Sequence, residues 1–95
     1  MKKVAVLIKD PDQQYEGLRV SLGALLDEVD VRMIVLNHEV RHMDEAYREN
    51  MEFLDEMEGQ RFSNNPTNVE KYGFTYASRK QVAEQLKAVD VVIPF

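Results

Sequence analysis

The sequence has no cysteine among its 95 residues. The chain therefore supplies no disulfide framework, no thiolate metal ligand, no iron–sulfur ligand and no thiol nucleophile of its own. Basic residues are also few, because 12 Lys and Arg face 17 Asp and Glu, for a net charge of −5, and they are scattered along the chain. Without a basic patch, neither nucleic acid nor an anionic membrane surface is expected as a partner.

Long hydrophobic runs are absent as well. The first run, Val4–Ile8, ends at Lys9 and is too short for a signal-peptide core or a membrane span. We therefore expect a cytoplasmic protein. A composition of 44% hydrophobic and 31% charged residues is typical of a globular chain. The length suits one domain over residues 1–95, and no repeat or linker divides it.

Short apolar runs alternate with amphipathic segments along the chain. The run Met33–Leu36 has the continuous hydrophobicity of a strand that is covered on both faces, so we expect it in the middle of a sheet. Helical spacing begins near Gln13 and again after Asp44, and Ser78 opens a capping-box pattern. The apolar side of the first helix is expected at Leu18, Leu22, Leu25, Leu26 and Val29. That of the second helix is expected at Met43, Tyr47, Met51, Leu54 and Met57. The pattern predicts an α/β three-layer sandwich, with a mainly parallel sheet of four to five short strands and helices on both faces. The expected strands are residues 4–8, 31–36, 60–62, 74–76 and 91–93.

Two glycines interrupt the first predicted helix. Gly17 and Gly23 each weaken a helix by roughly 1 kcal/mol relative to alanine. A close packing contact would explain such a glycine, and so would plain tolerance. The sequence leaves both explanations open.

Polar residues follow three of the predicted strands. In a parallel sheet the carboxyl ends of the strands meet at one edge, which is where open α/β sheets bind ligands. Helix-leading loops there also offer backbone N–H groups to an anion. The alternative is that these side chains simply face water. We predict a binding site for a small ligand or a protein partner at this edge, with no catalytic residue, metal or cofactor assigned, formed by Lys9, Asp10, Asn37, His38, Ser63, Asn64 and Asn65.

One short motif points to different chemistry. The stretch from His38 to His42 reads H-E-x-x-H, the zinc-protease signature, which needs both histidines on one helical face and a third ligand. Here we expect a loop, because His38 ends a strand and Asp44 caps the following helix. A metal-dependent hydrolase that takes Glu52, Asp55 or Glu56 as third ligand is kept as an alternative, and so is an enzyme that uses His38 with Asp10 or Asn65.

The order of elements resembles the DsrE/DsrF-like family of small α/β domains associated with sulfur metabolism and sulfur relay. The likeness covers nearly the whole chain and rests on the opening strand Lys2–Ile8, the strand end Asn37-His38-Glu39-Val40, the run Gln60–Phe74 and the closing helix and strand Ser78–Phe95. Catalytic members carry a cysteine at a position that falls at or near Asn65 here. Because this chain has no thiol, persulfide relay is not carried over.

The resemblance also implies assembly into trimers or hexamers. Late aromatic residues that a small core cannot fully cover would leave an apolar patch for such self-association. The preferred interpretation is a non-catalytic homo-oligomer that binds a small ligand or a protein partner at the edge of the sheet. An oligomeric scaffold without a ligand site is the other alternative. The aromatic residues concerned are Tyr72, Phe74, Tyr76 and Phe95.

Overall fold

The computed structural model describes residues 2–41 and 43–95, which form a five-stranded, fully parallel sheet in the order β4-β3-β2-β1-β5. The predicted α/β sandwich is confirmed. The strand that the sequence places in the middle of the sheet, β2, indeed lies there, between β1 and β3. The strands are β1 (Lys3–Ile8), β2 (Asp30–Val35), β3 (Gln60–Ser63), β4 (Thr75–Tyr76) and β5 (Val91–Pro94).

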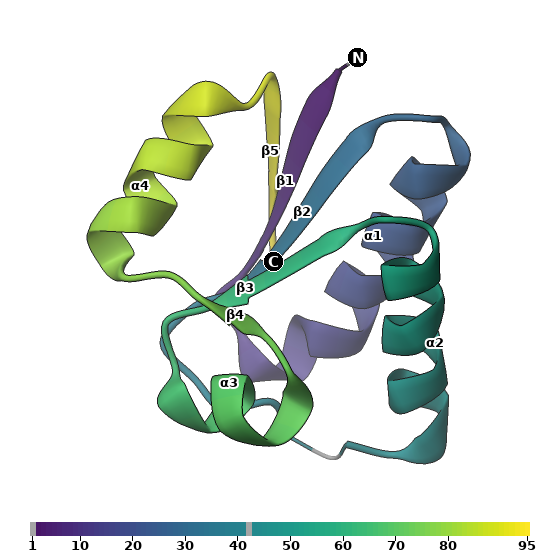
Figure 1. The fold of residues 1–95 in the computed structure, drawn as a ribbon, viewed down its shortest axis with the longest axis vertical. Coiled ribbons are helices and arrows are strands. Elements are labelled where there is room, and N and C mark those ends of the chain that lie inside the picture. Colours follow the sequence, from purple (N-terminus) through teal and green to yellow (C-terminus); the bar gives the residue numbers. More distant parts are fainter. Residues whose placement is uncertain (1, 42) are drawn as a thin grey trace.

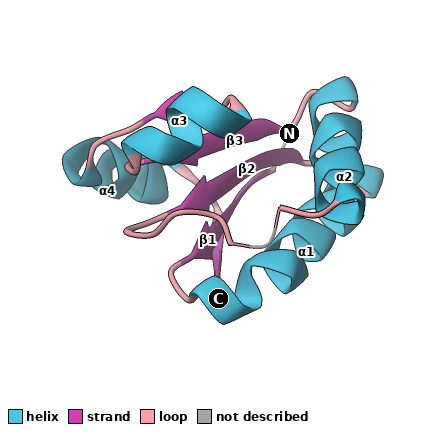
Figure 2. Cartoon of the chain, turned by 90° about the horizontal axis from the view of Figure 1, so that it is seen from below, coloured by secondary structure: helices cyan, strands magenta, loops and turns pink. Residues whose placement is uncertain are grey.

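The helices cover the two faces of the sheet unequally. In Figure 1, α1 and α2 lie on one side of the sheet, α4 lies alone on the other, and α3 lies beside β3 and β4. Figure 2 shows the same separation from below, with α4 apart from α1 and α2. The chain steps across the sheet from β1 to β4 and then returns through α4 to β5, so the last helix falls on the opposite face. The helices are α1 (Gln14–Leu26, preceded by a 3₁₀ turn at Pro11–Gln13), α2 (Glu45–Glu56), α3 (Pro66–Tyr72) and α4 (Arg79–Ala88).

The core lies on both faces of β1 and β2. Every residue from Val4 to Ile8 is buried, as expected for a strand that helices cover on both sides. The larger core cluster joins these strands to α1 and α2, and a smaller one joins them to α4. One expectation is wrong. Leu26 belongs to the predicted apolar side of α1, but it ends the helix and is 69% exposed.

Side-chain caps begin most of the helices at the predicted places. The Asp44 carboxylate accepts a hydrogen bond from the Tyr47 N–H at 2.8 Å, and Ser78 and Gln81 form the expected capping box. Gly73 ends α3 in the left-handed conformation, with φ of 71°. These local signals fix where the chain turns at each end of the sheet.

The two glycines of α1 occupy different surroundings. A methyl group at Gly17 would overlap with the Ile8 side chain, so a close contact between α1 and β1 requires glycine there. Gly23 has open space where its side chain would be. Close packing therefore explains the first glycine, and tolerance explains the second.

The late aromatic residues are divided between core and surface. Phe74 is buried at 2% exposure, whereas Tyr76 is 54% exposed. Tyr72 and Phe95 pack against the larger core cluster. Within the described residues, no helix has the length and apolar character needed to cross a membrane.

Candidate functional site

The carboxyl ends of the strands do meet at one edge, as predicted. The Lys9 N–H donates to the Phe95 carbonyl at 2.8 Å, which joins the ends of β1 and β5. The Asn37 N–H donates to Asn64 Oδ1 at 2.7 Å, which joins the loops after β2 and β3. Polar groups from four strand ends therefore share this edge, and their hydrogen bonds show which of them remain free for a ligand.

Most of the predicted site residues form an internal hydrogen-bonded cluster, which we call the asparagine network (Asn37, Ser63, Asn64, Asn65 and Asn68). Asn64 Nδ2 donates to Asn37 Oδ1 at 3.0 Å, and Asn64 Oδ1 accepts from the Asn37 backbone N–H, so the Asn64 side chain binds both the side chain and the backbone of Asn37. Asn37 Oδ1 also accepts from Arg79 Nε at 3.0 Å. Asn65 caps α3 by accepting from the Thr67 N–H at 2.9 Å.

Asn68 is the centre of this network, and the sequence did not single it out. Its side chain is fully buried, and its Oδ1 accepts from the Val40 N–H at 2.8 Å. Its Nδ2 donates to the His38 carbonyl at 2.9 Å and to Ser63 Oγ at 3.0 Å. One amide thus holds the loop after β2 against the end of β3. We conclude that the asparagine network has a structural role that uses up much of its hydrogen-bonding capacity.

The other predicted residues differ in how free they are. Asp10 caps the 3₁₀ turn by accepting from the Asp12 N–H at 2.9 Å, and Ser63 is fully buried. Lys9 is exposed. The structure therefore gathers the predicted residues at one edge but leaves few of them, chiefly Lys9 and His38, free to contact a ligand.

His38 is partly buried at this edge. Its Nδ1 lies 3.1 Å from the Leu36 carbonyl, while its Nε2 is buried without a partner among the described residues. Burial has the largest effect on the pKa of His38 and lowers it; in decreasing order, the hydrogen bond with the Leu36 carbonyl raises the pKa, the positive charge of Arg41 lowers it, and Asp10 raises it. The net effect favours the neutral imidazole over the charged one.

The H-E-x-x-H motif does not lie on a helix as far as it is described. Residues 38–41 have no helical structure, α2 begins only at Glu45, and His42 lies outside the described residues. Among the described residues, no group of three or more His, Asp or Glu side chains is placed to hold a metal ion. The structure offers no support for the zinc-protease arrangement.

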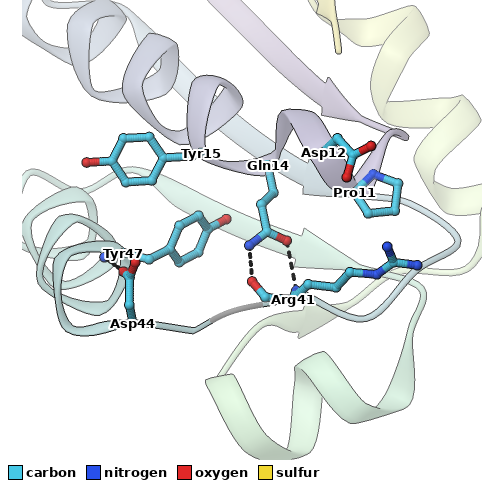
Figure 3. Close-up of a pocket in the computed structure, with 7 residues that line it drawn as sticks. All are labelled: Pro11, Asp12, Gln14, Tyr15, Arg41, Asp44 and Tyr47. Carbon is cyan, nitrogen blue, oxygen red and sulfur yellow. Dashed lines mark hydrogen bonds between the residues drawn. The ribbon is translucent and has the colours of Figure 1, made fainter.

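A pocket opens beside the asparagine network, between the loop after β1 and the loop after β2 (Figure 3). Its volume is about 340 Å³, which is within the range of small-molecule sites. None of the predicted site residues lines it, although it belongs to the same edge of the sheet. We call it the tyrosine pocket, and its lining residues are Pro11, Asp12, Gln14, Tyr15, Arg41, Asp44 and Tyr47.

A buried glutamine fastens the two loops that form this pocket. Gln14 is 7% exposed, and its Oε1 accepts from the Arg41 N–H at 2.8 Å. Its Nε2 donates to the carbonyl of the same residue, as the paired dashes in Figure 3 show. These two hydrogen bonds tie the beginning of α1 to the backbone of the loop after β2. The backbone of Arg41 is fixed while its side chain remains exposed.

The hydroxyl of Tyr47 is the unusual group in the pocket. Tyr47 is 1% exposed, and its hydroxyl is buried without a hydrogen-bond partner among the described residues. Figure 3 shows the hydroxyl pointing from α2 toward the Gln14 side chain, whereas the Tyr15 hydroxyl points away. Burial raises the pKa of Tyr47 well above its usual value, so the phenol stays protonated and remains a donor.

Both signs of charge are present around the pocket. In Figure 3 the Arg41 side chain extends toward the part of the pocket where Pro11 and Asp12 lie, and Asp44 lies below Tyr47. The Asp44 carboxylate already caps α2, which leaves Asp12 as the more available acid. The pocket can therefore offer a guanidinium, a carboxylate and a phenolic donor to one small ligand.

Sequence reasoning missed the residues that form this pocket. Tyr47 was read as part of the apolar side of α2, which is correct for its ring but gives no sign of an unpaired hydroxyl. Gln14 had no distinguishing pattern, because its partner lies 27 residues away.

Comparisons of the chain with protein-family models, with curated proteins and with solved structures gave no match.

Proposed function

We propose that the chain is a non-catalytic, DsrE/DsrF-like homo-oligomer that binds a small polar ligand, or a polar group of a protein partner, in the tyrosine pocket. It would be related to sulfur-relay proteins without performing relay chemistry, because it contains no thiol. The observation that carries the proposal is the buried Tyr47 hydroxyl beside the pocket, which has no hydrogen-bond partner in the part of the chain that the structure describes. A buried polar group without a partner costs about 1–3 kcal/mol, which a ligand acceptor would recover on binding.

The charges around the pocket suggest the chemistry of the ligand. Arg41 suits a carboxylate or phosphate, and Asp12 suits an amino group, so a small zwitterion fits better than a simple anion. Because the Tyr47 hydroxyl is covered, a side chain beside it must turn aside to admit the ligand. Tyr15 is suited to this movement, since the residue is 40% exposed and its ring centroid lies 6.3 Å from that of Tyr47.

A titration of the folded protein tests this function. Amino acids, inorganic phosphate and acetate are titrated while the melting temperature and the amide NMR signals are followed. We expect amino acids to bind best, and we expect Tyr47→Phe to weaken binding at least tenfold, the effect of losing one hydrogen bond to a charged group. Tyr15→Phe is the matched control and leaves affinity unchanged, because that hydroxyl points away from the pocket.

Two results would contradict the pocket assignment. One is equal binding by wild type and Tyr47→Phe, and the other is the absence of stabilisation by every compound. Asn65→Ala separates this pocket from the asparagine network. It removes the cap of α3 and lowers stability, but it leaves ligand affinity intact if the ligand binds in the tyrosine pocket.

Exposed apolar side chains support self-association. Leu26 is 69% exposed, Tyr76 54% and Phe53 47%, so large apolar side chains are available for contacts between copies of the chain. Light scattering on the purified protein at micromolar concentration is expected to give the mass of a trimer or hexamer. A monomer at that concentration would remove the oligomer from the proposal without affecting the pocket.

A further inference from the structure

A second hollow lies on the opposite face of the sheet from α1 and α2. Because α4 alone covers that face, a groove of about 410 Å³ remains between α4 and the strands β2, β3 and β4. It is separate from the tyrosine pocket, with which it shares no residue. We call it the α4 groove, and the residues that matter for its chemistry are Arg32, Phe62, Tyr76, Glu84, Gln85 and Ala88.

Two of the residues that line this groove each have a buried polar atom without a hydrogen-bond partner among the described residues. Arg32 Nε is a hydrogen-bond donor, and Gln85 Oε1 is an acceptor. The nearest carboxylate to the arginine is Asp30, whose Oδ2 lies 4.0 Å from Nη2, too far for a strong hydrogen bond. The arginine side chain is only 20% exposed, so water replaces these missing contacts poorly. A binding partner for both atoms must offer one acceptor and one donor.

The remaining walls suit a flat ring. Phe62 is half-buried and Tyr76 is 54% exposed, so aromatic surface is available at the groove, and Ala88 leaves room on the α4 side. Aromatic side chains stack favourably on flat apolar ligands. Glu84 also lines the groove, and its carboxylate opposes the binding of an anion.

We propose that the α4 groove binds a flat aromatic molecule that carries an amide or lactam group. Its carbonyl accepts from Arg32, its N–H donates to Gln85, and its ring lies against Phe62 and Tyr76. This site does not depend on the ligand of the tyrosine pocket. Loss of either binding activity leaves the other intact.

Three probes of nearly equal shape test the chemistry of the groove. Benzamide carries an acceptor and a donor, benzoate carries acceptors only, and benzamidine carries donors only. We expect benzamide to bind with a millimolar dissociation constant, as its small size allows, and the other two at least tenfold more weakly. Amide NMR signals of the full chain report both affinity and location. Tightest binding by benzoate or by benzamidine would overturn the proposed ligand class.

Matched variants locate the two contacts. Arg32→Met and Gln85→Met keep the length and much of the apolar surface of the side chains, and each is expected to weaken benzamide binding about tenfold. Lys87→Met is the control, because Lys87 is exposed on α4 outside the groove. Tyr47→Phe is expected to leave benzamide binding unchanged, whereas it impairs the tyrosine pocket.

The ligand-free protein supplies the remaining test. If Arg32 and Gln85 instead pair with one another in solution, their single and double methionine variants will have non-additive free energies of unfolding. Additive free energies of unfolding, together with benzamide binding by the wild-type protein, support the site. Non-additive values, or benzamide binding that survives in both single variants, would overturn it.

Discussion

The asparagine network and the tyrosine pocket lie side by side at the same edge of the sheet, but their polar groups are in opposite states. In the network, the buried Asn68 amide contacts three different groups of the chain. In the pocket, the equally buried Tyr47 hydroxyl contacts none among the described residues. A high density of polar side chains therefore does not by itself identify a ligand site. Hydrogen-bonding capacity that the fold leaves unused is the better indicator.

The largest effect is expected from Asn68→Leu. The substitution leaves the Val40 N–H and the His38 carbonyl without their partner, at a cost of about 1–3 kcal/mol for each buried orphan. It also removes one of the hydrogen bonds of Ser63 Oγ, which still accepts from the Asn65 N–H. We expect a loss of at least about 3 kcal/mol in the free energy of unfolding, measured by urea denaturation. Asn64→Ala is the control from the same network and should cost about 1 kcal/mol, because its partner Asn37 is exposed. A loss below that of the control would mean that the network is not structural.

A second pair of variants compares the two glycines of α1, which differ in how much space a side chain would have. Gly17→Ala places a methyl group against Ile8 in the core and is expected to destabilise the protein by about 1–3 kcal/mol. Gly23→Ala meets open space in the same helix and should stabilise it by about 0.5–1 kcal/mol. Thermal unfolding of both variants measures the difference. Shifts of the same sign would contradict the described contact between α1 and β1.

The smallest effect concerns the pH dependence that His38 contributes. Its pKa in the folded state lies below that of the unfolded chain, because burial disfavours the charged ring. The folded state therefore binds fewer protons, and the contribution of His38 to stability is fully present above a pH of about 6.5 and is lost as the pH falls from there through the lower folded-state pKa. Stability measured between pH 8 and 5 should fall less in His38→Gln than in wild type. Parallel curves would show that the imidazole is not buried in solution.

The sequence was sufficient to predict the fold because its signals are local. Continuous apolar runs mark strands that are covered on both faces, and the capping residues Asp44, Asn65 and Ser78 stand where helices begin. The edge where the polar strand ends meet followed from the parallel arrangement. The role of each residue at that edge did not, because it depends on contacts between distant segments. The pairing of Gln14 with Arg41 spans 27 residues, and that of Val40 with Asn68 spans 28.

The same dependence on distant contacts explains why the sequence pattern did not single out Tyr47 of α2 as a candidate for ligand binding. The spacing of Tyr47, Met51 and Leu54 correctly predicts that they are buried. Whether a buried tyrosine hydroxyl finds a partner is decided by what stands opposite it, here α1 and the loop after β2. No periodicity in the sequence reports that property.

The most direct test of the contrast between the two regions is the free energy of unfolding of Tyr47→Phe without any ligand. The hydroxyl has no hydrogen-bond partner among residues 2–41 and 43–95, so its removal should leave the free energy of unfolding unchanged or raise it by about 1 kcal/mol in urea denaturation at pH 7. A decrease of more than about 1 kcal/mol would show that the hydroxyl already has a partner within the folded chain, and the tyrosine pocket would then be no different from the asparagine network beside it.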